Sequence, residues 1–243
     1  MPVHGREKVE TFAPKAWAAI QDLLGGEEGI DEAASTWGNS FIVNLGTPEL
    51  EAATDTIAPQ DLDNWHVDGD FFVHYLDSPE QALLVIPIFS DILPRGGGTM
   101  ISPDGLDLMA RYLAAHPEGV IPEDLTFIPS TSTVEPRCDD PGFWSHPPEI
   151  KKCQRFVELT GEVGDNYLRI PRVITNPPVS LKEPFNFNRE DPELYSLVER
   201  KTLLALGVER LDFKPTTKRK EDSPGTQEKA RLKTMSPDNK YVS

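Results

Sequence analysis

Proline and glycine divide this chain into segments that are too short for a helical bundle. The 243 residues include 23 prolines and 17 glycines, and seven of the prolines stand between residues 117 and 155. Because both residue types favour turns and proline breaks helices, we expect short strands joined by turns, with an irregular excursion at 117–155. The nearly continuous apolar run at 81–89 predicts a strand that is buried on both faces.

Helical periodicity is confined to three segments, at 6–24, 105–115 and 192–206. Gly25 and Gly207 directly follow two of them, where glycine commonly ends a helix. Strands are expected between and around these helices. The pattern predicts a mostly β fold with flanking helices, a β-sandwich or jelly roll. The expected strands lie at 40–44, 65–74, 81–89, 100–101, 156–160 and 172–176.

The net charge and the cysteine content restrict the partners and the cellular compartment that can be expected. The formal net charge of -16 argues against nucleic acid or an anionic membrane as the main partner. The longest apolar run, 82–86, falls far short of the ~20 residues of a membrane span. With only Cys138 and Cys153, and no apolar leader near Met1, we expect a cytoplasmic protein. No feature indicates an oligomeric state.

The last 30 or so residues differ in composition from the rest of the chain. From Lys214 onward the sequence is polar, basic residues outnumber acidic ones, and apolar periodicity is almost absent. Such a composition is typical of a disordered terminus. We therefore expect one domain at 1–213 and a disordered polar tail at 214–243.

The segment Trp65–His74 carries the most informative motif. It predicts a strand that begins with His66 and Asp68, whose side chains share one face because strand side chains alternate. An imidazole and a carboxylate placed in this way could bind one divalent ion. A second histidine would complete the two-His-one-carboxylate triad of non-haem Fe(II) oxygenases. The alternative is a simple turn at Asp68–Asp70. A calcium-binding loop that includes Asp61 and Asp63 is rejected, because Trp65 stands where such a loop needs an oxygen ligand.

Four motifs together resemble the phytanoyl-CoA dioxygenase family of Fe(II)/2-oxoglutarate oxygenases, in particular its fungal members. The similarity extends from residue 1 to about 210, and the family fold is a double-stranded β-helix, a jelly roll of cupin type. The motifs are Trp65–Asp70, Arg95–Thr99, Phe156–Asp165 and Arg169–Pro178.

The resemblance implies a role for four residues. His66 and Asp68 would hold Fe(II), and Arg172 would bind the far carboxylate of the co-substrate 2-oxoglutarate. A planar guanidinium suits that role because it makes two parallel hydrogen bonds to a carboxylate. Thr99, at the end of the glycine turn, is a candidate for a neighbouring hydrogen bond. The implied activity is hydroxylation of a small organic substrate, with 2-oxoglutarate converted to succinate and carbon dioxide.

The chain departs from the family pattern after Asp165. In the family, a strand with a His-Pro and then the distal metal histidine follows this turn; here the sequence continues at once with Asn166–Arg169, and one core strand is expected to be missing. Three interpretations follow. The deletion is real and the protein is an impaired or metal-free relative, or another histidine, His146 or His74, completes the site. In the third, the sequence is a mis-spliced or mis-predicted version of an active enzyme. The alternative function is a catalytically inactive jelly-roll protein that binds a partner.

Overall fold

A computed structural model of the chain describes residues 6–38, 57–62, 65–66, 73–80, 82–120, 148–169, 179–217 and 219. The expected strands at 40–44 and 172–176, and most of the one at 65–74, lie outside these residues. Within the described ranges, strands form three two-stranded antiparallel sheets. The closure of a jelly roll therefore stays a prediction.

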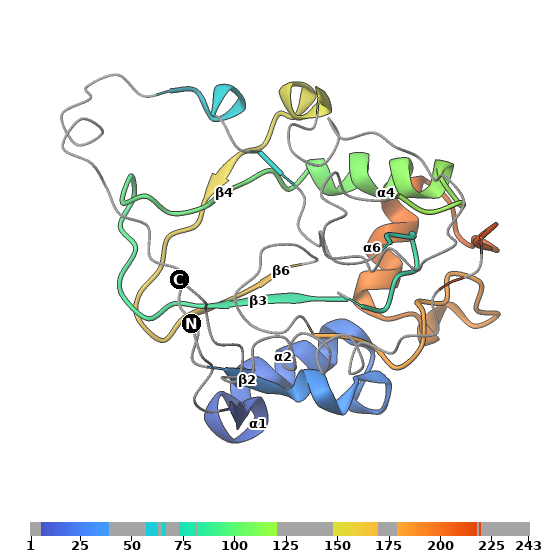
Figure 1. Cartoon of the computed structure of the whole chain (residues 1–243), viewed down its shortest axis with the longest axis horizontal. Helices are drawn as coiled ribbons and strands as arrows, with labels where there is room; N and C mark the ends of the chain where they lie inside the picture. Colours follow the sequence, from blue (N-terminus) through green and yellow to red (C-terminus); the bar gives the residue numbers. More distant parts are fainter. Residues whose placement is uncertain are drawn as a thin grey trace, which may run out of the picture.

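A long antiparallel ribbon is the central feature of the described part (Figure 1). Strand β3 (Leu84–Pro87) pairs with β6 (Asn166–Arg169), so that Leu84 lies opposite Arg169 and Pro87 opposite Asn166. The same register continues through a hydrogen bond from Ile88 N to Asp165 O and an isolated bridge between Ile92 and Gly161. Farther along, β4 (Met100–Ile101) pairs with β5 (Val157–Glu158).

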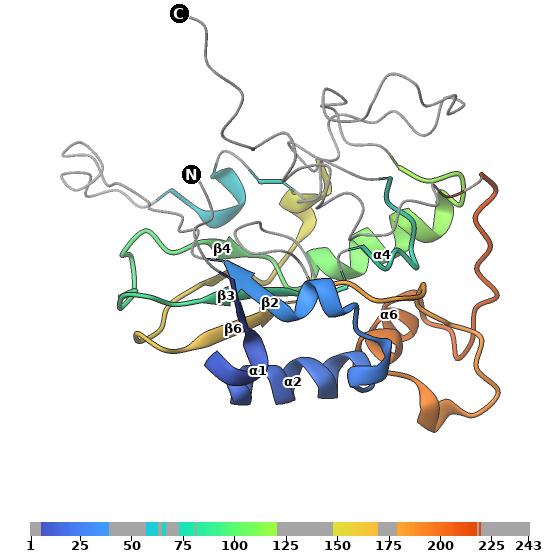
Figure 2. The same ribbon diagram turned by 60° about the horizontal axis from the view of Figure 1, so that its bottom comes forward.

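The N-terminal helices cover one face of β3. Helix α1 (Val9–Phe12) leads into α2 (Pro14–Leu24), which has proline in its first turn and ends at Gly25 in the left-handed conformation, with φ +85°. Figures 1 and 2 show α2 running alongside the β3–β6 pair. Strand β1 (Arg6–Lys8) precedes these helices and pairs antiparallel with β2 (Thr36–Gly38).

Two further helices pack on each other beyond the ribbon. Helix α4 (Gly105–Ala115) contacts α6 (Leu197–Leu206), and both lie to the right in Figure 1. Helix α6 begins with a capping box, in which Ser196 Oγ accepts from Glu199 N and Glu199 accepts from Ser196 N. It ends at Gly207, again left-handed with φ +71°. Five short 3₁₀ turns complete the described elements: Glu27–Gly29, Glu32–Ser35, η3 (Pro59–Asp61), η5 (Pro148–Lys152) and Pro192–Leu194.

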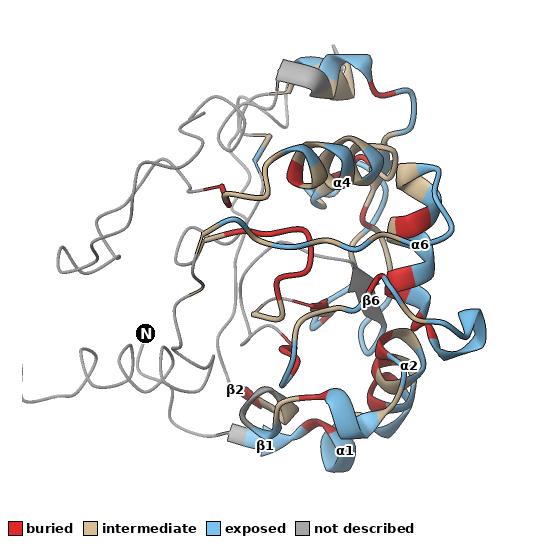
Figure 3. Ribbon diagram, turned by 90° about the vertical axis from the view of Figure 1, so that its right-hand side faces the viewer, coloured by how far each residue is buried: buried red, intermediate tan, exposed pale blue. Residues whose placement is uncertain are grey.

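The described part has three apolar clusters. The first joins α2 to β3 and includes the fully buried Ile20 and Leu83; the second joins α4 to α6 through Leu113 and Leu203. The third lies on the ribbon and contains Ile88, Ile101 and Leu159. In Figure 3, buried and exposed residues alternate along α2 and α6, as expected for helices with one face on a core.

Several local predictions are confirmed. Helix α4 has the predicted bounds, and β4 follows the glycine turn. The strands expected at 81–89 and 156–160 are shorter, Leu84–Pro87 and Val157–Glu158. The predicted burial of 81–89 is confirmed at 82–85 and Ile88 but is wrong at Phe89, which is 52% exposed. Two helices are shorter than predicted. Residues 6–8 pair as a strand, and the C-terminal helix begins at Leu197 because Tyr195 and Ser196 adopt extended backbone conformations.

The C-terminal segment makes contacts beyond the predicted domain boundary at residue 213. Thr216 N donates to Pro117 O at 2.9 Å, and Arg219 forms an ion pair with Asp77. The tail after Arg219 lies outside the described residues. None of the helices in the described ranges has the length and apolar character that a membrane span needs.

Candidate functional site

His66 is held next to the ribbon by its neighbour Trp65. The indole Nε1 of Trp65 donates to Pro59 O at 2.9 Å, and the indole ring packs against Phe156, with 5.6 Å between the ring centroids. Phe156 directly precedes β5. His66 is exposed, and neither Trp65 nor His66 is in a strand of the described part, so the predicted metal-binding strand does not include its first two residues.

Phe156 is in turn positioned by Asp104, at the start of α4. The Asp104 carboxylate accepts hydrogen bonds from Gln154 N at 2.7 Å, Arg155 N at 3.3 Å and Ser102 Oγ at 3.0 Å. Burial raises the pKa of Asp104, but these hydrogen bonds outweigh that effect and the pKa lies below its usual value. The carboxylate thus stays charged and clamps the chain just before β5.

Thr99 follows a glycine turn whose backbone touches the facing strand. A Cβ built on Gly98 would lie 2.1 Å from Leu159 O, closer than any real contact, so only glycine fits there. Thr99 O accepts a hydrogen bond from Leu159 N at 2.9 Å, and the residue is exposed. On the same turn, Arg95 N donates to the Glu158 carboxylate at 2.8 Å.

Thr99 and Trp65, the neighbour of His66, therefore both contact one segment, Phe156–Leu159. His66 reaches this segment through Trp65, and Thr99 reaches it through its backbone hydrogen bond to Leu159. The other two predicted site residues, Asp68 and Arg172, lie outside the described residues. Their roles stay predictions, although β6 ends only three residues before Arg172.

The other histidines that could supply a further metal ligand differ in their surroundings. His74 is fully buried, and its backbone is bridged to Val120 by two hydrogen bonds of 2.9 Å, while His146 lies outside the described ranges. His116 Nδ1 is 2.8 Å from the Glu118 carboxylate, and its ring lies against Tyr112. Among the described residues, no three His, Cys, Asp or Glu side chains are grouped so that they could hold a metal ion.

The turn before β6 is held by a hydrogen bond within the turn and by one to Asp91 outside it. Glu162 N donates to the Asp165 carboxylate at 3.1 Å, Val163 N donates to Asp91 at 2.8 Å, and Gly164 is left-handed with φ +94°. Strand β6 begins at Asn166, directly after Asp165. The strand that directly follows the turn thus carries Asn, Tyr, Leu and Arg, and no imidazole.

One buried polar cluster was missed by the sequence reasoning. Asp77 and Glu80 lie close to Arg219, which stacks on the ring of Tyr75. Burial raises the pKa of both carboxyl groups, and the charge of Arg219 only partly opposes this. No local signal could have revealed the cluster, because Arg219 is 142 positions from Asp77 in a segment whose composition indicates disorder.

Comparison with known proteins adds no relative to these observations. No family model, curated protein or solved structure matches the chain. The resemblance of its motifs to the phytanoyl-CoA dioxygenase family stays a prediction from the residues themselves.

Proposed function

We propose that the chain is a jelly-roll protein of the Fe(II)/2-oxoglutarate oxygenase type, related to the phytanoyl-CoA dioxygenases. The observation that supports this most is that two motifs far apart in sequence contact one short segment, Phe156–Leu159, which contains β5. Trp65, beside His66, contacts Phe156, and Thr99 bonds to Leu159 three residues farther on. Motifs that share a site in the family are thereby neighbours of one short segment.

The ribbon supports the proposed fold. A jelly roll consists of antiparallel strands arranged in two facing sheets, and such strands can be followed as one long ribbon that folds over. Here the pair β3–β6 continues through the Ile92–Gly161 bridge to the pair β4–β5. The apolar side chains of Ile88, Ile101 and Leu159 form a cluster on this ribbon, as a core between sheets would require.

The proposed site would use four residues. His66 and Asp68 would hold Fe(II), which when bound supplies the oxidative chemistry of 2-oxoglutarate cleavage and substrate hydroxylation. The Arg172 guanidinium would bind the far carboxylate of 2-oxoglutarate with two parallel hydrogen bonds. Thr99 is exposed at the end of its turn, where its hydroxyl could hydrogen bond to the same ligand. The exposure of His66 suits a residue that must accept a metal ion from solution.

A second candidate function is a catalytically inactive binding protein on the same scaffold. The specific observation that favours it is β6, which follows the Glu162–Asp165 turn directly and pairs with β3 without carrying a histidine. A site with only His66 and Asp68 as protein ligands has one protein ligand fewer than a facial triad. Such a site would hold a metal ion more weakly while the arginine anchor could still bind a dicarboxylate.

Replacing Arg172 with alanine is expected to weaken 2-oxoglutarate binding by about 2 kcal/mol, or roughly thirtyfold, because the change removes a charge-assisted pair. Isothermal titration of 2-oxoglutarate into the Mn(II)-loaded protein measures this directly. Arg155→Ala is the matched control, since the Arg155 side chain is exposed and only its backbone N–H is engaged by Asp104. Equal affinities for Arg172→Ala and the parent protein would refute the anchor.

Succinate formation separates the two candidate functions. The oxygenase predicts that Fe(II), oxygen and 2-oxoglutarate yield succinate, and that His66→Ala abolishes it. The binding protein predicts 2-oxoglutarate binding that Arg172→Ala weakens, without succinate above the background of free Fe(II). Absence of both binding and succinate would contradict the whole proposal.

A further inference from the structure

The described C-terminal residues 214–217 and 219 lie across two loops that are far away in sequence. Thr216 N donates to Pro117 O at 2.9 Å, and Thr217 Oγ1 donates to Glu118 O at 2.9 Å. The same Thr217 hydroxyl lies 2.8 Å from the phenol oxygen of Tyr75. The segment therefore connects the loop after α4 to the loop Val73–Glu80.

Arg219 ends this connection against a carboxylate and an aromatic ring. Its guanidinium lies over the ring of Tyr75, with 4.7 Å from Cζ to the ring centroid, and its Nη2 bonds to Asp77 Oδ1. The side chain of Asp77 is 10% exposed and that of Arg219 24% exposed. A planar cation that stacks on an aromatic ring while pairing with a carboxylate is the arrangement in which arginine is preferred over lysine.

A second carboxyl group, that of Glu80, lies near Arg219 in addition to that of Asp77. Glu80 also feels the charge of Arg219, and burial raises the pKa of Glu80 and of Asp77. Among the described residues, neither Glu80 Oε2 nor Arg219 Nη1 has a hydrogen-bond partner, although both atoms are buried. The guanidinium is bonded to the carboxyl group of Asp77 and also interacts electrostatically with Glu80, so both acidic residues contribute to holding it.

We propose that Tyr75, Asp77 and Glu80 form a guanidinium-binding site, and that the described residues 214–217 and 219 form a strap that Arg219 fastens over the loop Val73–Glu80. The loop directly follows the segment that carries the His66 and Asp68 motif. Release of Arg219 would loosen the loop. This inference does not depend on the proposed oxygenase function.

Amide hydrogen exchange of the full-length chain tests the strap. Backbone hydrogen bonds in both directions join His74 and Val120, at 2.9 Å each, so these two amides report on the closed loop. In Arg219→Ala we expect them to exchange at least about tenfold faster, while amides in α2 are unchanged. Arg210→Ala is the control, because Arg210 lies nearby in sequence but bonds only to the Asn188 side chain among described partners. Unchanged exchange in Arg219→Ala, or an equal effect of Arg210→Ala, would overturn the strap.

Chemical rescue tests the guanidinium-binding site. Added N-acetylarginine amide is expected to restore protection of His74 and Val120 in Arg219→Ala, since it supplies the missing guanidinium. N-acetyllysine amide has the same charge without the planar group, so we expect less protection from it. Failure of the arginine compound to protect, or equal protection by the lysine compound, would overturn a guanidinium-binding site.

Discussion

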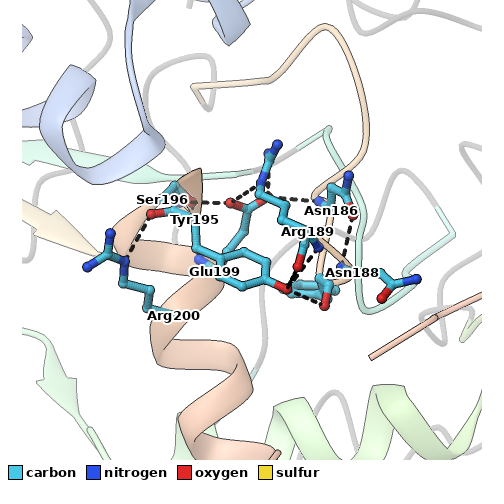
Figure 4. A network of polar contacts seen from close by, with 8 residues as sticks. Asn186, Asn188, Arg189, Tyr195, Ser196, Glu199 and Arg200 are labelled. Atoms are coloured by element: carbon cyan, nitrogen blue, oxygen red, sulfur yellow. Dashed lines mark hydrogen bonds and ion pairs between the residues drawn. The ribbon is translucent and has the colours of Figure 1, made fainter. Parts of the chain in front are cut away.

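Replacing Glu199 with alanine is expected to lower the free energy of unfolding by about 3 to 5 kcal/mol. The Glu199 side chain is 2% exposed and accepts hydrogen bonds from Asn186 N at 2.8 Å and Ser196 N at 2.7 Å (Figure 4). It also pairs with Arg189, at 3.1 Å from Nη2. Truncation would leave these donors without their acceptor and remove half of the capping box of α6.

Glu193→Ala is the matched control for this prediction. Glu193 is also an acidic residue near the start of α6, but its side chain is 85% exposed and lies 3.7 Å from Arg200. Exposed pairs of this kind contribute little, so a change within about 0.5 kcal/mol is expected. Urea denaturation followed by circular dichroism measures both variants. If Glu199→Ala were no more destabilising than Glu193→Ala, the network in Figure 4 would not stabilise the fold.

The second large effect is expected from Gly98→Ala, with a loss of about 3 kcal/mol of folding free energy. The added methyl group would overlap Leu159 O, at 2.1 Å, and lie 3.1 Å from Ile92 Cγ2. Backbone atoms cannot move aside as a flexible side chain can, so the turn must shift. The hydrogen bond from Leu159 N to Thr99 O would then be lost, and with it the contact that holds Thr99 to the segment Phe156–Leu159.

Gly97→Ala separates this overlap from ordinary backbone strain. Gly97 has φ +83°, which disfavours alanine, but nothing lies within 4 Å of its added Cβ. A cost of about 1 kcal/mol is therefore expected. Thermal unfolding of the two variants, with amide exchange at Leu159, provides the measurement. A Gly98→Ala protein as stable as Gly97→Ala, with Leu159 still protected, would contradict the close contact.

Local chemistry explains which elements could be predicted from the sequence. The apolar spacing in 105–115 and the glycines at 25 and 207 act within one or two turns of helix, and α4 and the ends of α2 and α6 agree with the prediction. The start of α6 could have been found as well, since Ser196 and Glu199 have capping-box spacing. Strand β1 could not, because Arg6–Lys8 is extended only through pairing with Thr36–Gly38.

The candidate site shows the same limit more sharply. The sequence motifs identify His66 and Thr99 as candidates. Their positions near the segment Phe156–Leu159 depend on the packing of Trp65 on Phe156 and on the absence of a side chain at Gly98. The guanidinium-binding site at Asp77 could not be predicted, because its cation comes from a segment with no apolar periodicity. Buried polar contacts between distant segments leave no pattern in composition or spacing.

Anaerobic titration with Fe(II) in the presence of 2-oxoglutarate tests the proposed function most directly. A metal bound by His66 and chelated by 2-oxoglutarate predicts a visible metal-to-ligand charge-transfer band that saturates with Fe(II). His66→Ala should abolish the band, and His116→Ala should retain it, since His116 is engaged with Glu118. Absence of the band in the parent protein, or the same band in His66→Ala, would contradict an Fe(II)/2-oxoglutarate site at His66.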